Sequence, residues 1–582
     1  MIGLVAVTAA GRAAAARLAA AWPDETRAYD GPAATALPDA FRGTGTVVAF
    51  LAVGATVRLL APLLGSKQHD PGVVCVDEAL RFAVPVVGAH AGGGNDLARR
   101  VAGVLGAEPV ITTASDSAGS VALDEFGAGL GFVIEPGSDL AAVGAAILSG
   151  QRVTFSSDQT WPVPPLPPSV ITAGPEPGVP AIVVTDGPAP DRDAPTVIYR
   201  PPSLVVGLGA SRGVPAAEVR TLIDLALTTA ALSPLSVRAA ATADLKADEE
   251  GLLAAVRERG WPLSTFPAAD LATVPVPSPS ETVRAAVGTP SVAEAAALLA
   301  ASHPAPANPT SNTGPKNLIV PKRTSPHATV AIARATPRGR LAIVGIGPGA
   351  RDLLTPRAVA ELRRARIVVG LDQYVRQVED LLRPGTTVRA SGLGQEQERA
   401  EAAVADAAAG HAVALIGSGD AGVYAMGSPA LEAASATIDV IGVPGVTAAL
   451  AAAAVLGAPL GHDHTMISLS DLHTPWEIIE HRVTAAAEAD LVVCFYNPAS
   501  QQRDWQLRKA LAILAGHRPP GTPVGWVRDA TRSGQSAGTA TLAGFDPAVV
   551  DMRTLVVVGS SRTRLVSGRM VTPREYRWAG TS

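Results

Sequence analysis

The sequence of 582 residues contains only two cysteines, Cys75 and Cys494, and they lie far apart in the chain. Two distant thiols cannot build the disulfide framework of a small secreted protein. Both lie in apolar runs typical of buried strands, so we interpret them as core thiols rather than nucleophiles. The scarcity of cysteine suits a reducing compartment, and we expect a cytoplasmic protein.

Long basic runs and long apolar runs are also missing. The net charge is −5, which argues against general binding of nucleic acid. The most apolar stretch, residues 448–460, is shorter than the roughly 20 residues that a bilayer requires. The first residues lack the basic region and cleavage pattern of a signal peptide. No His/Cys spacing typical of a metal site is present, so we expect no bound metal. From the charge and the short apolar runs we likewise expect neither nucleic acid nor a membrane as a partner.

The chain is rich in what folded domains need. Hydrophobic residues make up 47% and charged residues 17% of the sequence, which excludes general disorder. Aromatic residues make up only 4%, so Ala, Val and Leu must fill the cores. Short Val/Ile runs alternate with Ala/Leu-rich stretches, which is typical of α/β domains with largely parallel sheets. Because one core rarely exceeds about 300 residues, we expect a multidomain α/β protein.

Composition suggests four domains. Residues 1–130 form one α/β set, and the Pro- and Gly-rich residues 131–200 form a small central domain. A third α/β domain covers residues 201–336, and the last covers residues 340–582. The Pro- and Asn-rich segment 303–315 resembles a flexible loop. Two further strands are predicted after this loop, at 318–320 and 328–332, so we place the boundary near residue 337.

The last domain carries small or polar turns at the ends of successive predicted strands. They are Val344–Gly349, Gly417–Tyr424, Val443–Ala448 and Leu491–Pro498. After the first turn, Thr355 and Pro356 predict a helix start, with Thr355 as the N-cap. Open α/β sheets bind ligands at the carboxyl ends of their strands. Four such turns in one domain therefore predict a common ligand cleft.

These strings resemble the tetrapyrrole (class III) methyltransferase family over residues 340–582. Residues 417–424, 467–472 and 474–477 resemble the precorrin-3B C(17)-methyltransferases within it. The resemblance implies two α/β lobes, S-adenosylmethionine as methyl donor, and commonly a homodimer. It also implies methylation of precorrin-3B at ring carbon 17, with contraction of the ring to precorrin-4.

The resemblance also implies the cofactor contacts. Carried over by position, they are Pro348, Ser418, Gly419, Asp420, Val423, Thr447, Ala448, Asn497 and Ala530. Asp420 has two readings, since it could help to hold the cationic cofactor or only cap the following turn. The tetrapyrrole substrate carries carboxylates that suit guanidinium groups. Arginines near predicted strand ends are candidates for these carboxylates or ordinary surface residues: Arg528, Arg532, Arg562 and Arg564.

In the first domain, His90 lies within a run of glycines directly after a predicted strand. Such a run suggests exposed, flexible backbone that a ligand can approach, so we predict a functional role for His90. Lys67 precedes it in a polar loop. Asp96 follows at the expected start of a helix, where Asn95 or Asp96 would serve as the N-cap. Asp96 therefore has both a structural and a functional reading, and Glu78 is a further acidic candidate.

Residues 1–335 resemble the cobalt-precorrin-5A hydrolases, through strings around residues 53–63, 87–96, 109–116 and 206–213. The resemblance implies opening of a lactone on the contracted macrocycle, giving cobalt-precorrin-5B with release of acetaldehyde. We assign His90 as general base, and Lys67 or the 92–94 backbone as oxyanion donors. Asp96 completes the candidate catalytic set. The family's usual Cys-Arg is replaced here by Ala210-Ser211-Arg212, so no role for that cysteine transfers.

Two alternatives stay open. The same methyltransferase fold also serves diphthine synthesis and ribosomal RNA methylation, although the acidic charge and the fused partner argue against both. Residues 1–335 could instead form a non-catalytic module that binds the tetrapyrrole. The sequence does not decide whether the substrate is a precorrin or a cobalt-precorrin.

Overall fold

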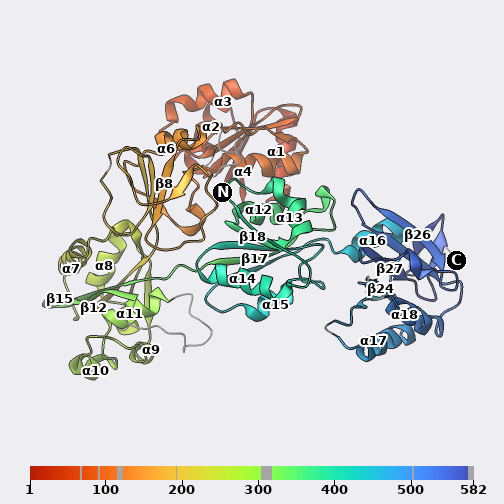
Figure 1. Ribbon diagram of the computed structural model, residues 1–582. Helices are drawn as coiled ribbons and strands as arrows, with labels where there is room; N and C mark the ends of the chain where they lie inside the picture. The colour runs from red at the N-terminus through yellow and green to blue at the C-terminus, as the bar shows by residue number, and fades with distance from the viewer. Residues whose placement is uncertain are drawn as a thin grey trace. The chain divides into compact units, whose positions relative to one another are not determined.

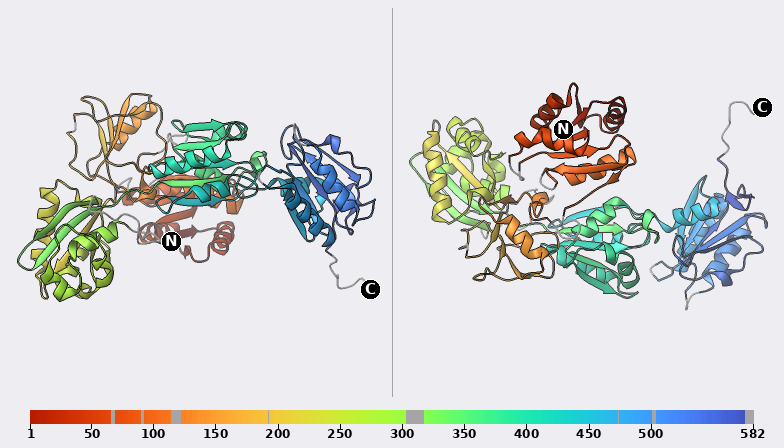
Figure 2. Two further views of the ribbon diagram at one scale, coloured as in Figure 1. Left: turned by 60° about the horizontal axis from the view of Figure 1, so that its bottom comes forward. Right: turned by 90° about the horizontal axis from the view of Figure 1, so that it is seen from above.

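The computed structural model describes residues 1–65, 69–89, 92–113, 122–191, 193–302, 317–472, 474–500 and 504–574. The chain forms two compact units, one of Met1–Pro337 with Arg383–Gly385 and one of Arg338–Leu382 with Thr386–Ser582. Each unit contains more than one β-sheet covered by helices (Figures 1 and 2). This confirms the multidomain α/β class.

The first sheet has the order β2-β1-β3-β4-β5-β6. Its strands are β2 (Thr26–Tyr29), β1 (Ile2–Ala6), β3 (Thr46–Phe50), β4 (Gly72–Val76), β5 (Phe82–Val87) and β6 (Glu108–Pro109). Helices α1 (Ala9–Ala21) and α4 (Gly94–Leu105) cover one face, and α2 (Ala33–Gly43) and α3 (Val53–Leu60) cover the other. β1 to β4 are parallel, whereas β5 runs antiparallel to β4. The carboxyl end of β5 therefore lies beside the amino end of β4.

The central sheet has the order β7-β11-β10-β8-β9. Its strands are β7 (Val133–Ile134), β11 (Thr196–Arg200), β10 (Ala181–Val184), β8 (Val153–Ser157) and β9 (Val170–Thr172). Helix α6 (Leu140–Leu148) packs on one face, over a core that includes the buried ring of Tyr199.

The third sheet has the order β14-β13-β12-β16-β15. Its strands are β14 (Leu263–Phe266), β13 (Val237–Ala243), β12 (Leu204–Ala210), β16 (Ala328–Arg334) and β15 (Leu318–Thr324). Helices α7 (Ala216–Thr229) and α8 (Glu250–Glu258) cover one face, and α9 (Ala268–Ala272) and α11 (Ala293–Ala301) the other, with α10 (Glu281–Val287) nearby in sequence. β15 and β16, predicted after the 303–315 segment, complete this sheet, since β16 pairs antiparallel with β12 and β15 pairs antiparallel with β16.

A buried ion pair joins the central and third sheets. Asp186, just after β10, is only 2% exposed and accepts hydrogen bonds from Arg334 on β16 at 2.8 and 2.7 Å. The hydroxyl of Ser203, directly before β12, donates to the same carboxylate at 2.5 Å. This pair therefore fixes the end of one sheet to the start of the next.

The second unit has two lobes. The sheet of the first is wholly parallel, with strands β19 (Thr387–Ser391), β18 (Ile367–Leu371), β20 (Ala412–Gly417), β17 (Arg340–Gly345) and β21 (Asp439–Val443). Helices α12 (Pro356–Arg364) and α13 (Asp372–Val378) cover one face, and α14 (Glu396–Ala408) and α15 (Gly427–Ala433) the other (Figure 1). Thr355 caps α12 as predicted, because its side chain accepts the Ala358 N–H at 3.2 Å.

The sheet of the second lobe is mixed rather than parallel. Its strands are β23 (His464–Ser468), β24 (Val492–Tyr496), β27 (Thr554–Val558), β25 (Pro523–Arg528) and β26 (Ser536–Thr541), and only β23 and β24 pair in parallel. Helices α17 (Trp476–Glu488) and α18 (Gln506–Ala515) cover one face, and α16 (Ala448–Leu456) the other. A small sheet of β22 (Gly457–Ala458), β29 (Arg569–Val571) and β28 (Arg564–Val566) adjoins α16.

Both cysteines lie in strands and are buried. Cys75 in β4 is 2% exposed and Cys494 in β24 is fully covered. Burial raises the pKa of the Cys494 thiol to about 12. These values support the interpretation of both as core thiols. Among the residues described, no helix is both long and apolar enough to cross a membrane.

Candidate functional site

A large cleft of about 2290 Å³ opens in the second unit, lined by residues of both of its lobes. The carboxyl ends of β17, β20, β24 and β25 and the start of α16 all contribute to its wall. Strands from two different sheets therefore end at one cavity, as the four polar turns predicted.

Glycines let three strand-end loops pack closely at one side of this cleft. Gly347 and Gly419 exchange backbone hydrogen bonds of 3.0 and 2.7 Å. A Cβ on Gly445 would lie 2.1 Å from the Gly419 carbonyl oxygen, and Gly419 itself has a φ of +66°. Three loops can approach one another this closely only because they carry no side chains at these points. This close packing brings together the loops whose residues Pro348, Ser418 and Thr447 line the cleft.

Eight of the nine positions predicted to contact the cofactor line the cleft: Pro348, Ser418, Gly419, Val423, Thr447, Ala448, Asn497 and Ala530. Asp420 is not among the lining residues. Its carboxylate accepts the N–H of Gly422 at 2.8 Å and the N–H of Gly445 at 3.0 Å. The structure therefore favours the second reading of Asp420, in which it caps the turn and ties it to the next loop.

Tyr496, at the end of β24, fixes the start of α16. Its hydroxyl accepts the Ala449 N–H at 3.0 Å and shares a 2.7 Å hydrogen bond with the Thr447 hydroxyl. Burial raises the pKa of this phenol, so the hydroxyl keeps its proton at neutral pH. The next residue, Asn497, donates to the Ser468 hydroxyl at 3.1 Å. Two of the predicted cofactor residues are thus held in place by side-chain hydrogen bonds.

Strained backbone gathers at the same cleft. Tyr424, Asn497 and Asp529 line it with φ values of +50°, +50° and +49°, a region that side chains other than glycine rarely adopt. Such strain persists only where the surroundings enforce it, and it is typical of functional sites.

Arg532 links the lobes across the cleft. Its guanidinium donates to the Pro348 carbonyl at 2.8 Å and to the Ser418 hydroxyl at 3.1 Å. Beside it, the Ala350 N–H donates to the Thr531 hydroxyl at 3.1 Å. The loop after β25 is thereby tied to the loops after β17 and β20. This role competes with the predicted one of holding a substrate carboxylate.

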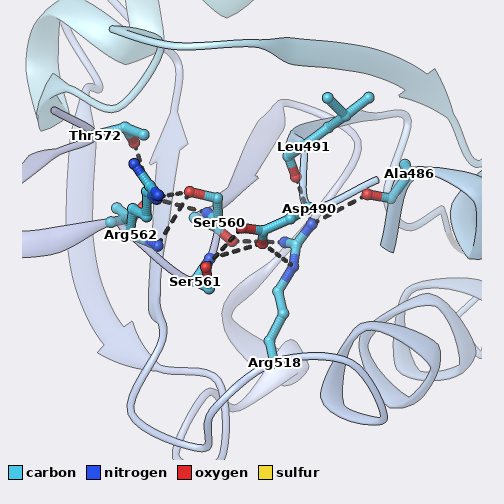
Figure 3. A network of polar contacts seen from close by, with 10 residues as sticks. Ala486, Asp490, Leu491, Arg518, Ser560, Ser561, Arg562 and Thr572 are labelled. Atoms are coloured by element: carbon cyan, nitrogen blue, oxygen red, sulfur yellow. Dashed lines mark hydrogen bonds and ion pairs between the residues drawn. The ribbon is translucent and has the colours of Figure 1, made fainter. Parts of the chain in front are cut away.

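The other three predicted arginines lie elsewhere. Arg528 forms an ion pair with Asp551 at 2.8 Å. Arg564 is exposed on β28. Arg562 belongs to a polar network around Ser560 and Thr572, which Figure 3 shows together with the buried Arg518. Thr554 and Leu555, at the start of β27, line the cleft, whereas Ser560 and Arg562 follow the other end of this strand.

In the first unit, two of the three predicted catalytic residues, His90 and Lys67, lie outside the described residues. The described glycines around them are closely packed rather than exposed and flexible. The Gly72 N–H donates to the Gly92 carbonyl at 2.9 Å, and a Cβ on Gly92 would lie 2.6 Å from the Asp70 carbonyl oxygen. These glycines thus have a packing reason that the sequence pattern did not reveal.

The start of α4 also differs from expectation. The N-cap is Gly93, with a φ of +75°, whereas Asn95 and Asp96 lie within the helix. Asp96 is exposed and pairs with Arg99 at 2.9 Å. The prediction that Asn95 or Asp96 caps the helix is therefore wrong, because glycine can take the left-handed turn that leads into it.

Antiparallel pairing separates Glu78 from this loop. Val76 pairs with Ala83 and Val73 with Val87, so the ends of β4 and β5 lie at opposite edges of the sheet. Glu78 follows β4 and accepts a hydrogen bond from Thr8 at 3.1 Å, whereas Gly88 follows β5. Glu78 therefore does not share an edge with the glycine loop. Within the described ranges, no cluster of three or more His, Cys, Asp or Glu could hold a metal ion.

Comparisons with known proteins agree with this organisation. Residues 340–546 match the family described as Tetrapyrrole (Corrin/Porphyrin) Methylases. The Probable cobalt-factor III C(17)-methyltransferase of Salmonella typhimurium is 45% identical over 239 residues, which cover 40% of this chain and 99% of that protein. The chain belongs to the tetrapyrrole methylase family.

The N-terminal part of this tetrapyrrole methylase matches three further families. They are Cobalamin synthesis G N-terminal (35–116), Cobalamin biosynthesis central region (121–201) and Cobalamin synthesis G C-terminus (204–333). The Cobalt-precorrin-5A hydrolase of Priestia megaterium is 32% identical over 320 residues, which cover 52% of this chain and 82% of that protein. The chain thus also belongs to the cobalt-precorrin-5A hydrolase family, and it is a bifunctional enzyme of cobalamin biosynthesis.

Among solved structures, that of the methyltransferase CobJ matches with 39% identity and a TM-score of 0.38. The match covers 40% of this chain and 100% of that one.

Sequence reasoning did not single out two residues that line the cleft of this methylase, Arg482 and Tyr424. Arg482, in the middle of α17, lines the cleft, as does Tyr424. An arginine within a helix looks like any solvated surface residue, so no pattern distinguishes Arg482. Tyr424 stood within the recognised 417–424 string, and only its positive φ sets it apart from its neighbours.

Proposed function

We propose that the second unit binds S-adenosylmethionine in the cleft and transfers its methyl group to ring carbon 17 of a tetrapyrrole. The observation that carries this proposal is the meeting of eight predicted cofactor positions at one cleft. The close packing of Gly345, Gly419 and Gly445 supports it further, because it holds together the loops that carry Ser418 and Thr447 at the cleft.

When bound, S-adenosylmethionine supplies a methyl group that its sulfonium already activates. The protein therefore has to hold and align rather than to activate. Tyr496 orients the Thr447–Ala449 turn, and Arg532 holds the loops after β17 and β20 against the loop after β25. Alignment of donor and acceptor in a preorganised cleft accounts for most of the rate that such a site supplies.

We further propose that the substrate is the cobalt form of the macrocycle. The relatives from Salmonella typhimurium and Methanothermobacter thermautotrophicus are each named as a probable cobalt-factor III C(17)-methyltransferase. The fused hydrolase family is likewise named for a cobalt-precorrin. Both names support substrates that already carry cobalt. The alternative substrate of the methyltransferase is the cobalt-free precorrin-3B.

For residues 1–335, we propose hydrolysis of the lactone of cobalt-precorrin-5A, with release of acetaldehyde. Likeness to the hydrolase over 82% of its length supports catalysis over a silent binding module. His90, Lys67 and Asp96 remain the proposed catalytic residues, with His90 as the base. We also propose that residues 1–130, 131–200, 201–336 and 340–582 are separate domains, in line with their separate sheets.

Four assays on the full chain test these proposals. Calorimetry with S-adenosylmethionine should give saturable heat. Mass spectrometry should show gain of one methyl group on cobalt-factor III and little on precorrin-3B. Cobalt-precorrin-5A should yield acetaldehyde. Absence of heat at millimolar cofactor would reject the methyl-donor site, and absence of acetaldehyde would favour the binding module.

A further inference from the structure

The cleft is larger than one ligand needs. Its volume of about 2290 Å³ exceeds the roughly 300–1,000 Å³ of ordinary small-molecule sites. The lining includes large apolar side chains that are unusually exposed: Leu393 (75%), Leu472 (74%), Tyr424 (54%), Met552 (46%) and Trp505 (38%). Apolar side chains gathered around a cavity mark a surface that a ligand covers. The outer part of the cleft therefore suits a broad apolar ring beside the cofactor.

Among the described residues, four arginines line this cleft: Arg399, Arg482, Arg532 and Arg553. Three of them are engaged by protein groups. The partners are Ser391, Gly392 and Met426 for Arg399, Pro348 and Ser418 for Arg532, and Asp529 and Asp551 for Arg553. Within the part of the chain that the structure describes, Arg482 forms no hydrogen bond or ion pair, and its side chain is exposed. It is the lining cation whose charge is left for a ligand.

The surroundings of Arg482 are also ordered for binding. Tyr424 reaches from the loop after β20 to β23, where its hydroxyl donates to the Met466 carbonyl at 2.8 Å. Its ring lies 5.2 Å from that of Tyr496. Partial burial raises the pKa of Tyr424, and the nearby charge of Arg482 acts in the opposite direction. The strained Tyr424 thus bridges the lobes within the electrostatic reach of Arg482.

We propose that Arg482 binds a peripheral carboxylate of the macrocycle and so determines which polycarboxylate ring the cleft accepts. This inference rests on the proposed methyltransferase function. A guanidinium presents parallel N–H donors that match a carboxylate, and such pairs give both charge and orientation. The ring would then lie against the exposed apolar side chains while one acidic arm reaches α17. Arg482 is a specificity-determining residue and takes no part in the methyl transfer itself.

Steady-state kinetics of the full-length enzyme with cobalt-factor III test this role. Arg482→Gln should raise KM roughly 10- to 100-fold, the effect of a lost charge-assisted hydrogen bond, and leave kcat within a few-fold. Arg482→Lys should recover part of the loss, because it restores the charge without the fork. Affinity for S-adenosylmethionine, measured by calorimetry, should stay unchanged in both variants. The KM of the parent enzyme should rise with salt more steeply than that of Arg482→Gln.

The matched control is Arg508→Gln, an exposed arginine on the neighbouring helix α18 that does not line the cleft. Its KM should equal that of the parent enzyme. An unchanged KM in Arg482→Gln, in an active enzyme that binds cofactor normally, overturns the inference and leaves the methyltransferase function intact. A parent enzyme that neither binds S-adenosylmethionine nor transfers methyl overturns both. If Arg482→Gln loses cofactor binding, the KM of Arg482→Lys for cobalt-factor III decides instead: a KM above that of the parent supports the inference, and an equal KM overturns it.

Discussion

Backbone conformation at single residues sets apart the cleft of the second unit. Glycine and non-glycine residues alike take positive φ there, at Gly347, Gly419, Tyr424 and Asn497. The glycines do so without penalty, whereas each of the others stores strain of about 1–3 kcal/mol. The surrounding hydrogen bonds must hold these residues in place, and the cleft is therefore preorganised before any ligand enters.

The positive φ of Gly419 can be tested directly by substitution. Gly419→Val should abolish detectable binding of S-adenosylmethionine, because a β-branched residue resists a φ of +66° and its Cβ would lie 3.4 Å from the Thr447 Cα. Calorimetry on the full chain measures the affinity. Gly442→Val is the control, since it lies on the edge strand β21 with nothing within 4 Å of its Cβ. Normal affinity in Gly419→Val would remove this residue from the site.

At the residue scale, a local sequence pattern was enough to locate the cleft. Strand-end turns of small and polar residues are recognisable in the sequence, and eight of the nine predicted cofactor positions line the cleft, whereas their contact with a cofactor stays a prediction. Asp420 shows the limit, because whether a carboxylate faces a ligand or its own backbone depends on the neighbouring Gly445 loop. Arg482 shows another limit, since its proposed role depends on its having no protein partner among the described residues, which no sequence pattern reveals.

Among the elements, helix α17 is held near its C-terminal end by Arg518 (Figure 3). The side chain of Arg518 is fully covered and donates to the Gly559 carbonyl at 2.6 Å, to the Ala486 carbonyl at 3.5 Å and to the Leu491 carbonyl. One guanidinium thereby joins the last turn of α17 to the start of β24 and the end of β27. We therefore expect the position of helix α17, and with it that of Arg482, to depend on the hydrogen bonds of Arg518.

Arg518→Met should destabilise the second unit, because the buried carbonyls lose their donors at a cost of about 1–3 kcal/mol each. The measurement is the thermal unfolding of the full chain, in which the transition of this unit should shift to lower temperature. Arg569→Met on the exposed face of β29 is the control and should leave the transition in place. An unshifted transition in Arg518→Met would contradict the structural role.

The buried ion pair of Asp186 and Arg334, which joins the central and third sheets, can be tested in the same way. Asp186→Ala should cost roughly 2–3 kcal/mol, below the 3–5 kcal/mol typical of fully buried pairs, since Arg334 keeps 33% of its side chain exposed. Chemical denaturation of the full chain measures the loss. Glu176→Ala breaks the exposed pair with Arg152 and should cost less than about 1 kcal/mol. An equal loss of unfolding free energy in the two variants would argue against a stabilising role for the Asp186–Arg334 pair.

Element types were easier to predict than their pairing. The alternation of Val/Ile runs with Ala-rich stretches predicted an α/β chain, and the N-cap at Thr355 agrees with the structure. The mixed sheet of β23 to β27 was missed, because strand direction is decided by contacts between distant segments. The same reason explains the separation of Glu78 from the glycine loop, which follows from the reversal of β5.

Viewed as a whole molecule, the chain places the two groups of candidate residues in different compact units. His90 lies outside the described residues, and its flanking segments belong to the first unit, whereas all the residues of the cleft belong to the second. The proposed chemistries share no residue. A substitution in one unit should therefore leave the other activity untouched.

His90→Ala should lower the rate of acetaldehyde release by roughly 10²–10⁴-fold, the contribution of a general base, and spare methyl transfer. An imidazole with an ordinary pKa of about 6.5 is largely neutral and basic near neutral pH. His69→Ala, an exposed histidine of the same unit, serves as the control and should retain both activities. Acetaldehyde release within a few-fold of the parent rate would exclude His90 as the base.

The burial of both native thiols has a practical consequence for this enzyme. Cys75 and Cys494 are covered within their strands and stay protonated, so maleimide reagents should not label the folded chain. A single cysteine added at an exposed site such as Arg564 would then be the sole point of attachment for a fluorescent dye. The wild-type sequence is thus already a suitable background for following ligand binding with a site-specific reporter.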